Sequence, residues 1–230
     1  MVRASPAQVC FPVAPALLRC AALQTTVLLI RHGITAWHAE GRVLGQRDVP
    51  LSPEGVAQAE EVAANLAGVK LGEVLSSPLQ RAVQTAEIIG REASIEVARD
   101  PRLNDFKLGK WTGMSYAEVA ADAEYQRFLR DPASTGIPGG ESLLEIQRRA
   151  IAAVEQALSD APSGDAVAIV THAGVIRVLL SHYMGSPPAN YHRIRVNPGS
   201  ISILSFADDR ELPRVLAVNL GGSIQRVLGR

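Results

Sequence analysis

The hydrophobic and polar positions after residue 26 alternate between two patterns. Short runs of consecutive apolar residues are typical of strands buried on both faces of a sheet. Such runs predict strands at Val27–Ile30, at a segment ending with Val74–Leu75, more weakly at Ile95–Val97, at Ala166–Val170, and at Ile201–Phe206 and Val215–Leu220, the last two as a hairpin.

Helical patterns occupy most of the segments between these strands. Ser52 and Pro53 provide an N-cap and a proline at the first helical position, and they predict a helix to about Leu66. Further helices are predicted from Ser77–Pro78 with Ala82, Ala86 and Ile89 on one face, irregularly at Met114–Leu129, at Glu141–Leu158 with Leu144, Ala150, Ile151 and Val154 facing inward, and at Val175–Met184. Strands alternating with helices predict an α/β fold, with a largely parallel central sheet in a three-layer α/β/α sandwich.

The first 26 residues differ from the rest of the chain. They contain Arg3 and Arg19, three prolines and no acidic residue. Pro12 and Pro15 interrupt the apolar stretch that a targeting peptide would need. We therefore expect residues 1–26 to be a disordered extension, with a targeting segment as the alternative, and residues 27–230 to form a single domain.

Composition narrows the function classes. The chain has 23 Lys and Arg against 23 Asp and Glu, so its net charge of zero gives no reason to expect nucleic acid or an anionic membrane as a partner. No apolar stretch after the first two dozen residues is long enough for a membrane span. Cys10 and Cys20 form neither a disulfide framework nor a zinc pattern. We expect a cytoplasmic protein without a metal or cofactor.

Chemically active residues directly follow three predicted strands. The segments are Arg31–His32–Gly33, Ser76–Ser77–Pro78–Leu79–Gln80–Arg81 and Thr171–His172–Ala173–Gly174. Ligands of open α/β sheets bind beyond the carboxyl ends of the strands, where these side chains would meet. Arginine matches phosphate oxygens, and a neutral imidazole can act as a nucleophile toward phosphorus. Two arginines and two histidines at one sheet edge favour phosphoryl transfer without a metal.

These segments resemble the histidine phosphatase superfamily, also called the phosphoglycerate mutase-like family, from about residue 27 to about residue 185. The resemblance implies the phosphoglycerate mutase-like fold. It also implies that His32 becomes phosphohistidine while Arg31, Arg81 and His172 hold the phosphoryl group. The proton donor of the family is a glutamate in Leu-x-Glu-x-x-x-Gly-x-x-x-Gly, and Asp105 takes that position here. His38 stands where the family often has asparagine, so it is a further candidate ligand for the substrate.

The resemblance leaves the reaction open among three alternatives. A metal-independent phosphomonoester hydrolase of the histidine acid phosphatase type is favoured over a cofactor-dependent phosphoglycerate mutase and over a catalytically silent phospho-ligand-binding scaffold. Mutases of the family carry a longer insertion, whereas 35 residues separate Asp105 from Glu141 here. These residues, 106–140, are expected to form a lid.

The lid supplies four aromatic residues that would either form an apolar wall for a small-molecule phosphomonoester or pack the helices together. They are Phe106, Trp111, Tyr125 and Phe128. The sequence indicates neither the physiological substrate nor the oligomeric state.

Overall fold

A computed structural model describes residues 25–161, 164–207 and 213–228. The expected extension therefore lies outside the described residues, except for Thr25 and Thr26, which begin the first strand, β1 (Thr25–Arg31).

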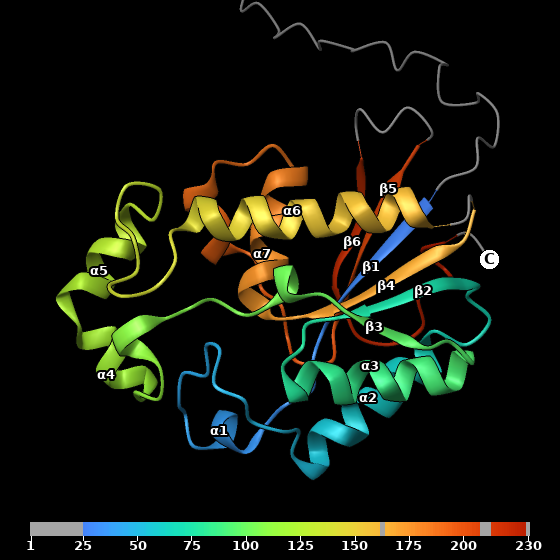
Figure 1. Ribbon diagram of the computed structural model, residues 1–230, viewed down its shortest axis with the longest axis horizontal. Coiled ribbons are helices and arrows are strands. Elements are labelled where there is room, and N and C mark those ends of the chain that lie inside the picture. Colours follow the sequence, from blue (N-terminus) through green and yellow to red (C-terminus); the bar gives the residue numbers. More distant parts are fainter. Residues whose placement is uncertain (1–24, 162–163, 208–212, 229–230) are drawn as a thin grey trace, which may run out of the picture.

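Within the described residues, six strands form one mostly parallel sheet in the order β3-β2-β4-β1-β5-β6 (Figure 1). Four neighbouring strands run parallel: β3 (Val97–Arg99), β2 (Leu71–Ser76), β4 (Ala166–Thr171) and β1. Next to β1, β5 (Ile201–Phe206) runs antiparallel and pairs with β6 (Arg214–Leu220) in the predicted hairpin. The largely parallel sheet predicted from the sequence is confirmed.

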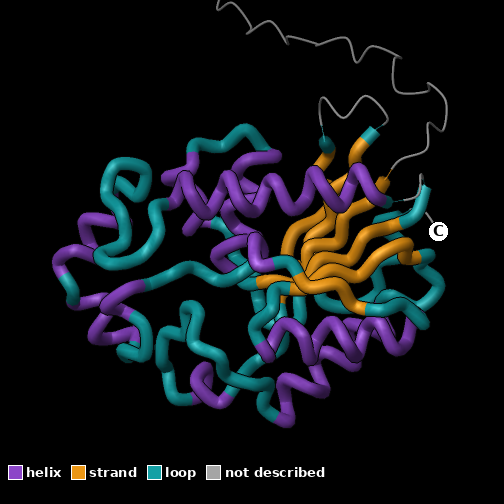
Figure 2. The backbone as a smooth tube through the Cα atoms, viewed as in Figure 1, coloured by secondary structure: helices purple, strands orange, loops and turns teal. Residues whose placement is uncertain are grey.

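Helices cover both faces of this sheet. One layer contains α6 (Leu143–Asp160) and α7 (Ala173–Tyr183), and the opposite layer contains α2 (Pro53–Asn65) and α3 (Gln80–Ala93) (Figure 1). Beyond the carboxyl ends of the parallel strands lie α1 (Ala36–Ala39), α4 (Tyr116–Ala121) and α5 (Ala123–Arg130), with long loops around them (Figure 2). Three short 3-10 helices occur at Pro101–Leu103, Gly109–Trp111 and Pro188–Arg193 among the described residues. The three-layer α/β/α arrangement is thus confirmed.

The sheet separates two hydrophobic layers, because side chains along a strand alternate between its faces. In β1, Val27 and Leu29 join the cluster that contains α6 and α7, whereas Leu28 and Ile30 join the cluster that contains α2 and α3. All four side chains are fully buried. Burying a side chain of this size contributes about 1.5–3 kcal/mol, so the buried strands hold the residues at their carboxyl ends in place.

Helix α6 differs from its prediction in the face that it buries. Leu144, expected to face inward, is 43% exposed, and Ile151 is only half-buried. Ser142 caps the helix by accepting a hydrogen bond from the amide of Glu145, so Leu143 is the first helical residue. Leu143 and Ile146, three residues apart, then share the buried face with Ala150 and Val154.

Two other helical segments also begin or break at residues that the sequence pattern did not predict. The irregular helix expected over Met114–Leu129 is two helices, because the Asp122 side chain accepts hydrogen bonds from the amides of Glu124 and Tyr125 and caps α5. Helix α3 begins at Gln80 rather than at Ser77–Pro78, and Asp48 accepts from the Gln80 amide at 2.7 Å.

Candidate active site

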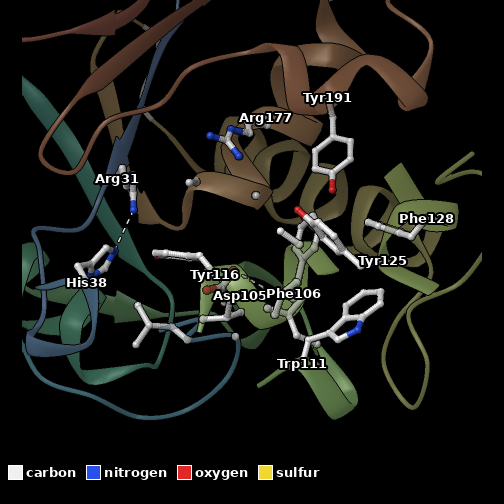
Figure 3. A pocket seen from close by; sticks show the side chains of 18 of the residues that line it. Arg31, His38, Asp105, Phe106, Trp111, Tyr116, Tyr125, Phe128, Arg177 and Tyr191 are labelled. Carbon is white, nitrogen blue, oxygen red and sulfur yellow. Dashed lines mark hydrogen bonds between the residues drawn. The ribbon is translucent and has the colours of Figure 1, made fainter. Parts of the chain in front are cut away.

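A cavity of about 450 Å³ lies at the carboxyl ends of the parallel strands (Figure 3). Arg31 and His32, from the end of β1, and Asp105 line it together with residues of α4, α5 and α7. His32 lies beside the His172 ring, and Arg81 contacts His32 from α3. The sequence therefore correctly predicted that these residues meet at one edge of the sheet.

The His32 ring is fixed in one orientation and is only 2% exposed. Its Nδ1 lies 2.6 Å from the carbonyl oxygen of Gly33, which can only accept, so Nδ1 carries the hydrogen. Nε2 therefore carries no hydrogen, and its lone pair accepts a hydrogen bond from Arg81 Nε at 3.2 Å. Burial, and then the charges of Arg81 and Arg31, hold the pKa of His32 well below its usual value. The imidazole is thus neutral and presents Nε2.

The backbone after His32 packs directly on the first turn of α2. A Cβ atom at Gly33 would lie 2.3 Å from the carbonyl oxygen of Gly55, and one at Gly55 would lie 2.0 Å from that of Ile34. The amide of Ile34 also donates to the Gln58 side chain at 2.9 Å. Two glycines are therefore required for the close approach that holds this loop.

Arg81 has no exposed surface, and all its nitrogens are engaged. Its Nη1 donates to the Arg47 carbonyl at 2.8 Å, and its Nη2 donates to the Gly45 carbonyl at 2.7 Å and to Asp105 Oδ2 at 3.0 Å. Its guanidinium is thus a fixed cation beside His32.

Arg31 is the second cation next to His32. Its Nη1 donates to the Val196 carbonyl at 2.8 Å, and its Nη2 lies 3.0 Å from His38 Nε2. Burial, and then the charge of Arg177, lower the pKa of Arg31 to about 10, so it remains charged at neutral pH.

His172 approaches the same space from the end of β4. Its ring centroid lies 5.0 Å from that of His32. The Ser77 hydroxyl donates to Asn104 Oδ1 and therefore accepts from His172 Nε2, at 2.8 Å. His172 Nδ1 is buried without a hydrogen-bond partner among the described residues, and it lies 3.7 Å from Asp105 Oδ2. Burial, and then the charge of Arg81, hold the pKa of His172 well below its usual value.

Asp105 lies between Arg81 and His172, with its side chain 17% exposed. Its Oδ1 accepts from the amide of Phe106 at 2.9 Å. Burial raises the pKa of Asp105, and the charge of Arg81 opposes this shift in part. The residue is placed where it can exchange a proton with a group beside His32.

Arg149 of α6 holds the loop that carries Asp105. Its Nη1 donates to the carbonyls of Arg102 and Asn104, both at 2.7 Å, and its Nη2 donates to the carbonyl of Asp105 at 3.2 Å. The same Nη2 forms an ion pair with Glu141 at 2.9 Å. The carbonyls of residues 102, 104 and 105 are thereby tied to one guanidinium. The sequence analysis did not predict this role for Arg149.

His38 has a donor at each ring nitrogen. The amide of Thr35 donates to Nδ1 at 3.1 Å, and the Thr35 hydroxyl lies 2.9 Å from the same atom. Arg31 Nη2 lies 3.0 Å from Nε2. A neutral imidazole has a single lone pair, so it cannot accept at both positions at once. Burial, and then the charge of Arg31, lower the pKa of His38 to about 4, which favours the neutral ring. His38 lines the cavity, as expected of a candidate ligand.

The four lid aromatics all line the cavity, and each also packs against another aromatic ring, which for Phe106 is that of Tyr191. Trp111 makes an edge contact with Tyr125 at a centroid distance of 5.3 Å and lies 5.9 Å from Phe128. Trp111 and Phe128 are almost completely buried. The same residues therefore border the cavity and pack the helices together.

Sequence reasoning missed several residues that line the cavity. These are mainly Leu44, Tyr116, Arg177 and Tyr191. Ala173 and Arg177 both line the cavity and are four residues apart on α7, so their shared helix face was a usable signal. Tyr191 belongs to a 3-10 helix that no pattern predicted.

Two negative findings apply to the described ranges. No helix there is long and apolar enough to cross a bilayer. In those same ranges, no group of three or more His, Cys, Asp or Glu side chains is arranged to hold a metal ion.

Comparison with known proteins agrees with this site. Residues 27–220 match the model of the histidine phosphatase superfamily (branch 1). A probable phosphoglycerate mutase GpmB from Escherichia fergusonii is 32% identical over 203 residues, which are 87% of this chain and 94% of the relative.

Two solved structures superpose closely. A mycobacterial glucosyl-3-phosphoglycerate phosphatase in complex with VO3 has a TM-score of 0.77 and 30% identity, over 84% of this chain and 98% of its own. YhfR from Bacillus stearothermophilus has a TM-score of 0.78 and 29% identity, over 88% of this chain and 99% of its own. The family model, the relatives and the fold lead to one conclusion: this chain belongs to the histidine phosphatase superfamily.

Proposed function

We propose that this protein is a phosphomonoester hydrolase that forms a phosphohistidine at Nε2 of His32. The observation that carries the proposal is the orientation of one ring: Nδ1 is tied to the Gly33 carbonyl, which leaves Nε2 without a hydrogen and in contact with Arg81 Nε. A neutral imidazole held in this way can attack phosphorus without first losing a proton.

The first step forms a P–N bond at His32 and breaks the bond between phosphorus and the ester oxygen. As Nε2 bonds to phosphorus, Arg81 Nε loses its contact with that atom and donates to a phosphoryl oxygen instead. Arg31 is the second cation, and together they offset the phosphoryl charge, which is the main requirement of phosphoryl transfer. His172 Nδ1 has no other partner among the described residues. A bound phosphoryl dianion raises the pKa of this imidazole, so that Nδ1 takes up a proton and becomes a donor.

Asp105 is the proposed proton donor to the leaving alkoxide. Its raised pKa favours the protonated carboxyl that this role requires. After the alcohol leaves, the Asp105 carboxylate accepts a proton from the water that attacks phosphorus. The P–N bond then breaks, and His32 and inorganic phosphate are released.

His38 is proposed as a ligand of the phosphoryl group beside Arg31. Donors approach both ring nitrogens, and a neutral ring accepts from only one of them, so the contact with Arg31 can break when a ligand binds. A phosphoryl oxygen bound by Arg31 would also accept from His38 Nε2, with Nδ1 still accepting from Thr35. Arg31, His38 and the Thr35 amide would then all have a hydrogen-bond partner.

A cofactor-dependent phosphoglycerate mutase is the second candidate, favoured by the name of the GpmB relatives. Both reactions share the phosphohistidine step and differ in the acceptor, which is water for the hydrolase and a sugar acid for the mutase. The short lid and the glucosyl-3-phosphoglycerate phosphatase among the similar structures support hydrolysis. The cavity volume suits a small-molecule substrate.

The test is phosphate release from a panel of phosphomonoesters without added metal, together with a mutase assay on 3-phosphoglycerate and its bisphosphate cofactor. We expect release to exceed mutase turnover. Mutase turnover well above release would replace the proposal by its alternative. Absence of both activities would favour a binding scaffold.

A further inference from the structure

Arg177 is a cation in the cavity that the proposed chemistry does not use. It lies on α7, and its guanidinium is turned toward the cavity (Figure 3). Its Nε is buried without a hydrogen-bond partner, and no ion pair joins Arg177 to another described residue. Arg31 Nε is also without a partner among the described residues, but Arg31, Arg81 and Arg149 all donate to backbone carbonyls through their other nitrogens.

The charge of Arg177 is not balanced by the rest of the cavity. Asp105 is the single acidic residue among those that line it, and Asp105 is already paired with Arg81. Arg31 lies close enough for the charge of Arg177 to lower its pKa. Two cations thus face one small space, with an acidic partner for neither, which favours a ligand with two negative groups.

Two tyrosine hydroxyls complete the surroundings of Arg177. Tyr125 and Tyr191 both line the cavity, and their hydroxyl groups point into it (Figure 3). Burial raises the pKa of both phenols, although the charge of Arg177 opposes the shift in part. Both hydroxyls therefore stay protonated and can donate hydrogen bonds to the same acceptor.

We infer that Arg177 binds a carboxylate on the leaving group, so that the preferred substrate is a phosphorylated hydroxy acid. The inference rests on the proposed hydrolase function. One guanidinium and two hydroxyls match the charge and lone pairs of a monoanionic carboxylate, whereas a second phosphate dianion would call for more than one cation. Trp111 and Phe128 would lie against the apolar part of the leaving group.

The experiment compares two phosphomonoesters that differ at one carbon. 3-Phosphoglycerate carries a carboxylate where glycerol 3-phosphate carries a hydroxymethyl group, and the ester being cleaved is the same. Phosphate release is measured with the wild-type protein, Arg177→Met, Arg177→Lys and the control Arg148→Met, whose arginine is exposed on α6 away from the cavity. Thermal unfolding of each variant checks that it is folded.

We expect the wild-type protein to prefer 3-phosphoglycerate in kcat/KM. Arg177→Met should reduce this preference by about 10-fold to 100-fold, the effect of losing one charge-assisted hydrogen-bonding partner. Arg177→Lys should keep part of the preference, and Arg148→Met should keep all of it. If Arg177→Met does not fold, Tyr191→Phe provides the same test through a smaller loss of preference.

Two results would overturn the inference. One is a wild-type protein that hydrolyses both esters equally well, and the other is an equal loss on both esters in Arg177→Met. Either result would leave the hydrolase proposal standing as long as p-nitrophenyl phosphate is still hydrolysed. Failure of the wild-type protein on all three esters would instead contradict the proposed function itself.

Discussion

Arg81 Nε donates to His32 Nε2 at 3.2 Å, so the cation and the proposed nucleophile are in direct contact before any substrate binds. This contact aims the lone pair of the imidazole and opposes its protonation. Because Arg81 is also held by two carbonyls and Asp105, it cannot follow His32 if the ring rotates. The preorganised pair lowers the reorganisation that phosphoryl transfer would otherwise require.

Replacing His32 by alanine should abolish turnover. The variant loses the only atom that forms the P–N bond, and we expect kcat on p-nitrophenyl phosphate to fall roughly 10⁴-fold or more. His182→Ala is the matched control, because His182 is exposed and does not line the cavity. A chelator should leave the wild-type rate unchanged. Appreciable activity in His32→Ala, or loss of wild-type activity with chelator, would contradict the mechanism.

Asp105→Asn should have an effect that depends on the leaving group. An alkoxide needs a proton, whereas p-nitrophenolate leaves almost without one. We therefore expect a loss of about 10²-fold to 10⁴-fold on glycerol 3-phosphate and a much smaller loss on p-nitrophenyl phosphate. The measurement is kcat on both esters, and equal losses would remove Asp105 from the acid role.

The pH profile should have its optimum on the acidic side of neutrality. Activity needs neutral His32, which is lost as the pH falls through its pKa, and protonated Asp105, which is lost as the pH rises through its pKa. With ordinary pKa values, the pH range in which His32 is neutral would hardly overlap the range in which Asp105 is protonated. Because the pKa of His32 is lowered and that of Asp105 is raised, the two states share a range of pH.

The profile of kcat/KM on glycerol 3-phosphate from about pH 4 to pH 9 tests this window. Asp105→Asn should lose the alkaline limb. If the alkaline limb persists unchanged in this variant, the limb arises from the titration of a group other than Asp105.

Arg149→Met should act through Asp105. Removing the guanidinium frees the carbonyls of Arg102, Asn104 and Asp105, and the carboxyl then loses its fixed position. We expect kcat on glycerol 3-phosphate to fall about tenfold to a hundredfold, with a smaller effect on p-nitrophenyl phosphate.

Arg148→Met, on the exposed side of the same helix, is the control for this variant. A purely structural role for Arg149 would lower both rates by the same factor, and rescue by Arg149→Lys on both esters alike would support that view.

The sequence predicted well where the candidate reacting groups lie, because strand ends determine their positions. His32 and His172 each follow a strand of consecutive buried residues, and neighbouring parallel strands bring them to 5.0 Å between ring centroids. Arg81 was equally predictable, since it lies in the first turn of a helix that directly follows β2. Local sequence pattern and sheet topology are enough to predict where these three residues lie.

The leaving-group side of the cavity was less predictable. Tyr191 reaches the cavity because its ring packs 6.0 Å from that of Phe106 and 6.5 Å from that of Phe128, contacts that join distant segments. The inward face expected for α6 was wrong at Leu144 because the phase of a helix depends on where its cap lies, here Ser142. Periodicity alone does not contain either kind of information.

The mutual approach of Gly33 and Gly55 has a consequence for natural variation in this chain. Each glycine faces a backbone carbonyl of the other segment, so a methyl group at either position would separate α2 from the loop that follows the nucleophile. Much of α2 is exposed, and substitutions on that surface should be tolerated. The first turn of α2 is different, because a substitution there would misplace the His32 ring while the protein stays folded. Genetic changes far from any substrate contact would then reduce catalysis without unfolding the protein.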